Sequence, residues 1–211
     1  MNTLQSLDTT QLIALAAALG WASGLRLYAV LALTGLAGFL GWVPLPPGLQ
    51  LLQHPAMLAA SGFMVFVEFF ADKIPGVDSM WDVIHTVVRI PAGAALAAAV
   101  FGADQGTAAA LAALLGGTLA ATSHAAKATT RAAINTSPEP FSNIGMSLLG
   151  DLAVPSMLWL AVEQPLLAIA AVALAFVAMI VIVWMLSKFL RRVLSRLRLL
   201  FGAAPSTSAS A

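Results

Sequence analysis

The sequence contains no cysteine, and only 10 basic and 9 acidic residues occur among its 211 positions. Without cysteine there are no disulfide-stabilised folds, thiolate chemistry or cysteine-ligated metal sites. Charged residues make up 9% of the chain, compared with about 25% in soluble globular proteins. Because 60% of the residues are hydrophobic, the composition predicts an integral membrane protein.

Several familiar functional motifs are also missing. No Lys or Arg precedes the first apolar run, so the positive n-region of a secretory signal is absent and we expect a retained span from Leu12. The chain has no Gly-rich phosphate loop, no nucleophile elbow and no HExxH motif. We therefore expect no cofactor, and nothing in the sequence favours nucleic-acid binding.

What the sequence does contain is a series of long apolar segments separated by polar or proline-rich breaks such as "VPLPPGLQLLQHP", "DKIPGVDS" and "NTSPEP". These segments predict an all-α, polytopic membrane helix bundle of about six transmembrane helices, in a single domain over residues 1–187. The predicted spans are residues 11–43, 56–71, 81–102, 107–134, 141–162 and 166–186.

The distribution of Lys and Arg predicts the orientation. The loops at 44–55, 103–106 and 163–165 contain neither residue. With six spans, the cations of the other loops and of the C-terminal segment fall on one side, which the positive-inside rule assigns to the cytoplasm. The sequence therefore predicts a multi-pass protein of the inner (cytoplasmic) membrane with both termini in the cytoplasm.

The segment "SKFLRRVLSRLRLLF" alternates basic and apolar residues at helical spacing. It predicts a juxtamembrane amphipathic helix over 188–202 that binds anionic lipid headgroups, followed by a disordered tail over 203–211. An equally good interpretation is a positive-inside stop-transfer signal. The lipid-facing cations are Lys188, Arg191, Arg192, Arg196 and Arg198.

Polar residues recur at helical spacing within five of the spans. A charge at the centre of a membrane helix costs about 2.5–3.5 kcal/mol on insertion scales, so such residues are expected to face the bundle interior and to pair. We predict a polar cavity open to the cytoplasm, with Arg26 and Asp151 at its floor. The other candidates for this cavity are Glu68, Asp72, Asp82, His85, Arg89, His124, Lys127, Arg131, Asn143 and Ser147.

Each of these residues also has a simpler interpretation. Asp151 with Arg26 or Lys127 is either a structural ion pair or part of a gating or proton-coupling element. His85 is a hydrogen-bonded packing residue, a proton relay, or a metal ligand together with Asp78 and Asp82. The stripe in the third span further predicts that Arg89 meets Glu68 or Asp72 of the second span.

The two halves of the chain share weak similarities. In residues 10–102 and 107–187 the first span is long and Gly-interrupted, and the second carries an acid followed by proline. An odd number of spans in each half would invert one copy relative to the other, as in many transporters. The sequence thus raises the hypothesis of an inverted 3+3 repeat.

Four stretches, "GLRLYAVLAL", "GWVPLPPGLQLL", "FFADKIPGVDSMWD" and "RIPAGA", resemble a bacterial multi-pass membrane family known as a domain of unknown function. The resemblance extends over about residues 10–185, and "ADKIPGVDSMWD" is its most specific part. It implies a membrane location and no particular activity.

Three functional hypotheses follow. The first is a transporter or channel-like protein for a small solute or ion, which the polar stripes favour. The second is an intramembrane enzyme or lipid-handling protein that uses Asp82 and His85. The third is a structural or accessory membrane protein, and the sequence leaves open whether copies associate into a homo-oligomer.

Overall fold

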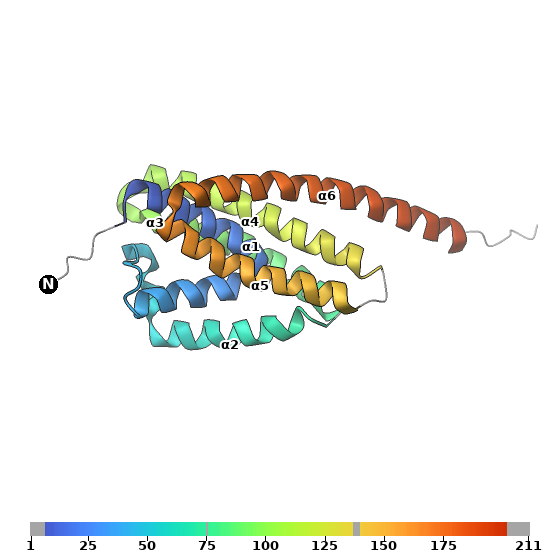
Figure 1. Cartoon of the computed structure of the whole chain (residues 1–211), viewed down its shortest axis with the longest axis horizontal. Helices are drawn as coiled ribbons and strands as arrows, with labels where there is room; N and C mark the ends of the chain where they lie inside the picture. Colours follow the sequence, from blue (N-terminus) through green and yellow to red (C-terminus); the bar gives the residue numbers. More distant parts are fainter. Residues whose placement is uncertain (1–6, 75, 137–139, 202–211) are drawn as a thin grey trace, which may run out of the picture.

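The computed structural model describes residues 7–74, 76–136 and 140–201, which form a bundle of helices (Figure 1). The predicted tail at 203–211 and the side chain of Arg198 lie outside the described residues. The elements in chain order are α1 (Thr9–Phe39), the 3-10 helix η1 (Pro47–Gln53), α2 (Pro55–Ala71), α3 (Val77–Phe101), the 3-10 helix η2 (Ala103–Gln105), α4 (Gly106–Ile134), α5 (Pro140–Glu163) and α6 (Pro165–Phe201).

The helices are long and apolar enough for a membrane. By length and composition, five are candidate spans, and the bent pair of η1 and α2 raises the number to six. The described residues contain no β-strand. The chain is therefore an all-α, multi-pass membrane protein, as its composition predicts.

The first helix begins with a complete capping box. The Asp8 side chain accepts a hydrogen bond from the Gln11 backbone N–H at 2.8 Å, and the Gln11 side chain accepts one from the Asp8 backbone. The helix is interrupted at Arg26, which has φ −148° and ψ 80°. At this residue the chain turns back, so that α1 consists of two helical segments, 9–25 and 27–39 (Figure 1).

Contacts between α1 and α2 are a second line of evidence for the reversal. The backbone of Gly35 packs against the Leu52 carbonyl and the Leu58 side chain near the start of α2. Arg26 forms an ion pair with Asp72, which caps the other end of α2. The segment 27–39 therefore runs antiparallel to α2, and α1 begins and ends at the same end of the bundle.

This reversal changes the predicted topology. Successive helices from α2 to α6 run in opposite directions along the bundle, so the start of α1 and the end of α6 lie at opposite ends of it (Figure 1). The expectation that both termini share one side assumed that the first span crosses the membrane once. In this arrangement α1 starts and ends at one end of the bundle, and the side of the membrane on which each terminus lies stays a prediction.

Helices α1, α3 and α4 pack closely because small residues line their contacts. A Cβ atom at Gly20 would lie 2.5 Å from the Gly116 Cα, and one at Gly93 would lie 2.6 Å from the Ala120 Cβ. Gly24 packs equally closely against Ser123 and Ala120. Small residues are the usual means by which membrane helices approach one another.

The structure does not confirm the inverted 3+3 repeat. In that scheme α1 corresponds to α4, yet α1 reverses at Arg26 whereas α4 runs as one helix from Gly106 to Ile134. Helix α6 also differs from α3, because it continues over 37 residues. The basic segment predicted as a separate surface helix is the last part of this continuous α6.

Candidate functional site

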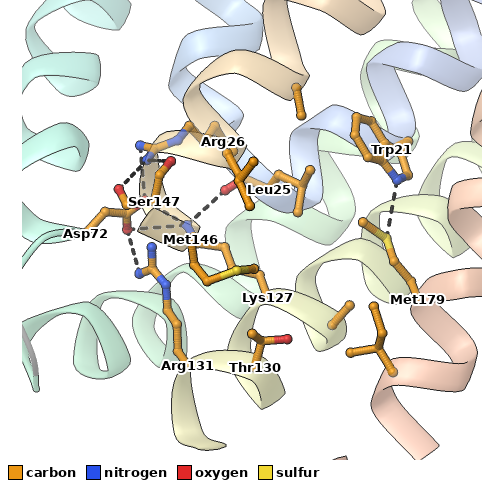
Figure 2. Close-up of a pocket in the computed structure, with 15 residues that line it drawn as sticks. Trp21, Leu25, Arg26, Asp72, Lys127, Thr130, Arg131, Met146, Ser147 and Met179 are labelled. Atoms are coloured by element: carbon orange, nitrogen blue, oxygen red, sulfur yellow. Dashed lines mark hydrogen bonds and ion pairs between the residues drawn. The ribbon is translucent and has the colours of Figure 1, made fainter. Parts of the chain in front are cut away.

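Charged side chains from α1, α3, α4, α5 and the end of α2 meet around the reversal of α1. Asp72 occupies the centre of this charged cluster and is fully buried. Its carboxylate lies 3.0 Å from Arg26 Nη1, 3.0 Å from Lys127 Nζ and 2.8 Å from Arg131 Nη1. One acid is therefore shared by three cations, which Figure 2 shows converging on it.

Arg26 connects this centre to α5. Its Nε lies 2.9 Å from Asp151 Oδ1, and its Nη2 donates to both the side-chain and backbone oxygens of Ser147 at 2.8 and 3.1 Å. All three guanidinium nitrogens thus have acceptors. Of the two partners that the sequence offered for Asp151, Arg26 and Lys127, the structure pairs it with Arg26.

Lys73 also belongs to the charged cluster, although the sequence assigned it only to a loop. Its Nζ lies 3.2 Å from Asp151 Oδ2 and 3.1 Å from the centroid of the Phe69 ring. The signal that could have identified Lys73 is its place beside Asp72 at the end of a span, where a lysine stem can extend along apolar surface.

A second group of ion pairs joins α2 to α3. Arg89 is 0% exposed and lies 2.6 Å from Glu68 Oε1 and 2.7 Å from Asp82 Oδ1. Asp82 in turn lies 3.3 Å from Lys127 Nζ and 3.5 Å from Arg131 Nη1. The predicted meeting of Arg89 with Glu68 is therefore present, and Asp82 connects both groups.

The interrupted backbone of α1 is also satisfied by side chains. Lys127 Nζ donates to the Leu25 carbonyl at 2.9 Å, and Ser123 Oγ donates to the Trp21 carbonyl at 2.7 Å. A helix break buried in a membrane protein leaves carbonyls without helical partners, and each needs another donor. Helix α4 supplies these donors.

Two of the three histidines, His85 and His124, lie beside the cluster. The His85 ring stacks on Trp81, and its Nε2 lies 3.1 Å from the Tyr28 hydroxyl. His124 Nε2 lies 2.7 Å from Thr86 Oγ1. Both arrangements fit hydrogen-bonded packing, and Tyr28 and Thr86 are partners that the sequence analysis missed.

The weak metal candidate is not supported. Asp78 accepts hydrogen bonds from Asn135 and from the backbone N–H groups of Gly76 and Ser79, whereas Asp82 pairs with cations and His85 with Tyr28. Within residues 7–74, 76–136 and 140–201, no group of three or more His, Asp or Glu residues is arranged to hold a metal ion.

Asn143 and the described cations of α6 stand apart from the ion pairs. Asn143 is fully buried one turn before Ser147, and no described residue is recorded as bonding its amide. On α6, Lys188 Nζ lies over the Trp184 ring at 3.6 Å, and Arg191, Arg192 and Arg196 lie in the terminal part of the helix.

A cavity of about 200 Å³ adjoins the charged cluster (Figure 2). Three cations, Arg26, Lys127 and Arg131, line it together with one acid, Asp72. Asp151 and Asp82 also pair with these cations, so that the two connected groups of ion pairs hold five cations and four acids, a formal charge of +1. The hydroxyls of Ser147 and Thr130 complete its polar part. The wall is therefore suited to a negatively charged group.

The remaining wall of this cavity is apolar. It includes Trp21, whose indole N–H lies 3.3 Å from Met179 Sδ, and side chains of α5 and α6. Met146, Leu149 and Ile182 are 41%, 60% and 39% exposed, so they form an apolar rim at the outside of the bundle. A second cavity, of about 390 Å³, lies between α1 and α5 and contains Trp42, Trp159 and Glu163.

Comparison with known proteins identifies one family. Residues 13–185 match the family described as "Domain of unknown function (DUF4126)". No curated protein matches the chain. No solved structure matches it either. Since the match covers most of the sequence, the chain belongs to the DUF4126 family.

Proposed function

We propose that this protein moves a small solute or ion across the membrane and that the charged cluster at the reversal of α1 forms its binding chamber. The observation that carries the proposal is the placement of Arg26 at the tip of a helical hairpin, beside a cavity lined by three cations and one acid. The positive wall favours an anion.

The form of α1 supports this proposal. Helices that turn back within a membrane are tolerated where they are buried in protein or line a water-filled cavity. In secondary transporters, interrupted helices supply the binding site near the middle of the bundle. In this chain the break exposes the Leu25 carbonyl to Lys127 and presents Arg26 to Asp72 and Asp151.

We further propose that the cavity lies in the cytoplasmic half of an inner membrane. Helices α2 and α4 end at the end of the bundle where α6 finishes (Figure 1). The cations that follow α2 or lie in the last turns of α4 and α6 are Lys73, Lys127, Arg131, Lys188, Arg191, Arg192, Arg196 and Arg198. The α1–α2, α3–α4 and α5–α6 connections at the other end contain no Lys or Arg. The positive-inside rule then places the end of α6 in the cytoplasm and the start of α1 outside.

The competing functions have less support. An intramembrane enzyme using Asp82 and His85 would need both groups at one cavity, but neither lines either cavity described above. A purely structural role accounts for the ion pairs between Arg89, Glu68 and Asp82. It gives no reason for a cavity beside three of the cations.

Transport is tested with purified protein in liposomes adsorbed on a supported membrane, where solute jumps give charge-displacement currents. The panel comprises chloride, phosphate, small carboxylates, sodium and protons. We expect at least one anion to give a saturable current that protein-free liposomes lack. Lys127→Met combined with Asp72→Asn, which removes one charge of each sign, should lower this current about tenfold or more, because a lost charge-assisted contact is worth about 1.5–3 kcal/mol.

Lys188→Met provides the matched control, since Lys188 is exposed on α6 and lies over Trp184 away from the cavity. Size-exclusion chromatography shows whether each variant remains folded. If no solute in the panel gives a current, or if the folded double variant transports as well as the native protein, the chamber is not a transport site.

A further inference from the structure

We infer that the cavity beside Arg26, Lys127 and Arg131 binds an amphipathic anion: a phosphate or carboxylate head carried on a hydrocarbon chain. This inference rests on the proposed function, because it names the class of ligand that the same cavity would take. It is carried by the two unlike halves of the cavity wall, one cationic and one apolar.

The cationic half can hold a negatively charged head. Arg26, Lys127 and Arg131 line the cavity and share the buried carboxylate of Asp72. With Asp82 and Asp151 counted, the two connected groups of ion pairs still hold five cations against four acids, so one positive charge remains in excess. Arg131 uses only its Nη1 in the ion pairs and hydrogen bonds recorded among the described residues. Arginine forks bind the oxygens of phosphate and carboxylate in pairs, and the Ser147 and Thr130 hydroxyls add further donors.

The apolar half continues from the head site to the lipid-facing surface. Leu25, Trp21 and Met179 line its inner part, and the exposed Met146, Leu149 and Ile182 form its rim. Figure 2 shows Trp21 and Met179 on the side of the cavity away from Asp72. A purely hydrophilic anion would leave this half of the wall without a partner, whereas a hydrocarbon chain would fill it and leave between α5 and α6.

The size of the cavity agrees with this division. A volume of about 200 Å³ corresponds to roughly six or seven water molecules at about 30 Å³ each. This is enough for an anionic head and the first few carbons of a chain, but not for a whole lipid. The rest of a longer chain would lie at the apolar rim, in contact with the hydrocarbon of the membrane.

Trp21 supplies a direct probe, because bromine quenches tryptophan fluorescence on contact. The full-length protein in a non-ionic detergent is titrated with bromohexyl phosphate and, in parallel, with the uncharged bromohexanol. The Trp21 contribution is the difference between native protein and the Trp21→Phe variant. We expect bromohexyl phosphate to quench Trp21 at a concentration about tenfold or more below the one that bromohexanol needs, because its charged head gains charge-assisted contacts.

A pair of glycine variants on α5 tests the location. Gly150 lines the cavity, and a Cβ atom there would lie 3.5 Å from Arg26 Nε, an ordinary contact. Gly150→Leu should therefore fill the cavity without removing a charge, and should abolish the preferential quenching. Gly145→Leu is the matched control on the same helix, because a Cβ atom at Gly145 meets nothing within 4 Å. It should leave the quenching intact.

Two further measurements identify the source of the ligand. If the ligand is a membrane lipid, brominated phosphatidylglycerol in nanodiscs should quench Trp21 more than brominated phosphatidylcholine does. If only bromohexyl phosphate quenches Trp21, the ligand is a free amphiphile. Inorganic phosphate should displace bromohexyl phosphate only at far higher concentration.

The inference is overturned if bromohexanol quenches equally, if inorganic phosphate competes at equal concentration, or if folded Gly150→Leu still shows the preference. Binding without any transport current would instead refute the proposed function and leave the ligand assignment standing.

Discussion

Asp72 is the residue on which the charged cluster depends most directly. It pairs with Arg26, Lys127 and Arg131, which come from two different helices, and it is fully buried at the end of a third. Removing a single acid from such a position leaves cations in a medium that solvates them poorly. Asp72 therefore balances the charge of α1 and α4, besides capping α2.

Arg89 and Glu68 offer a clean test of how a buried charge pair contributes to stability. Arg89→Met alone leaves the Glu68 carboxylate, 1% exposed, without its 2.6 Å partner. Asp82 keeps Lys127 and Arg131 as neighbours. Because breaking a buried pair typically costs about 3–5 kcal/mol, we expect Arg89→Met to lower the yield of folded protein strongly, and Arg89→Met with Glu68→Gln to restore much of it.

The measurement is the fraction of monodisperse protein after extraction, followed through a heating series. Lys188→Met serves as the reference for loss of an exposed charge. Equal losses in the single and double variants would mean that Arg89 acts through Asp82 or packing, and that its pair with Glu68 contributes little.

Much of this residue-scale picture could be predicted from spacing alone. Positions three and four apart share a helix face, which placed Asp82, His85 and Arg89 together and brought Arg89 to Glu68. Spacing could not predict which acid serves which cation, because Lys127 reaches Asp72, Asp82 and a backbone carbonyl at once. Partner choice among long flexible side chains is settled by tertiary geometry.

At the scale of elements, α1 is the helix whose form the sequence left open. Its run is long and Gly-interrupted near Ser23 and Gly24, but it contains no proline, so the pattern is compatible with one long span or a broken one. The reversal at Arg26 is held instead by groups far away in the chain, namely Asp72, Lys127, Ser147 and Asp151. A local pattern carries no information about such partners, so the reversal could not be predicted from α1 itself.

The first segment of α1 depends on its close approach to α4. A Cβ atom at Gly24 would collide with Ser123 Oγ and the Ala120 carbonyl. Gly24→Ala should therefore separate α1 from α4 and weaken the hydrogen bond from Ser123 to Trp21, lowering the midpoint of thermal unfolding by several degrees or more. Overpacking of this kind typically costs about 1–3 kcal/mol.

Gly62→Ala on α2 is the matched control, because a Cβ atom there meets nothing within 4 Å. Alanine is favoured over glycine in a helix, so this variant should be as stable as the native protein or slightly more so. If Gly24→Ala unfolds at the same temperature as Gly62→Ala, the helices adapt and their contact is looser than described above.

For the whole molecule, the reversal of α1 decides which parts of the chain share a side of the membrane. A single cysteine is added to the cysteine-free chain at Asp8, Gln50 or Lys188, all of which are exposed. We expect Asp8→Cys and Gln50→Cys to react with a membrane-impermeant maleimide from one side, and Lys188→Cys only from the other. Sidedness is measured in intact cells and after the membrane is opened.

If α1 crossed the membrane once, residues 8 and 50 would lie on opposite sides of it. Asp8→Cys and Gln50→Cys would then react with the maleimide from different sides. Asp104→Cys provides an internal reference, because η2 lies at the same end of the bundle as Gln50 in either case. Labelling of Asp8→Cys from the side of Lys188→Cys would show that α1 spans the membrane and would remove the basis of the proposed chamber.

The hairpin of α1 also has a consequence for biosynthesis. Arg26 leaves the ribosome long before its partners: Ser147, whose oxygens it contacts, lies 121 residues later. Until then Asp72 is the one acidic partner of this cationic tip that has been made, and Lys127 and Arg131 of α4 pair with the same carboxylate. The tip therefore carries an insertion cost that the finished bundle avoids. We therefore expect α1 to reach its final position late, after α5 has been synthesised, and chains that terminate before α5 to be substrates for membrane quality control.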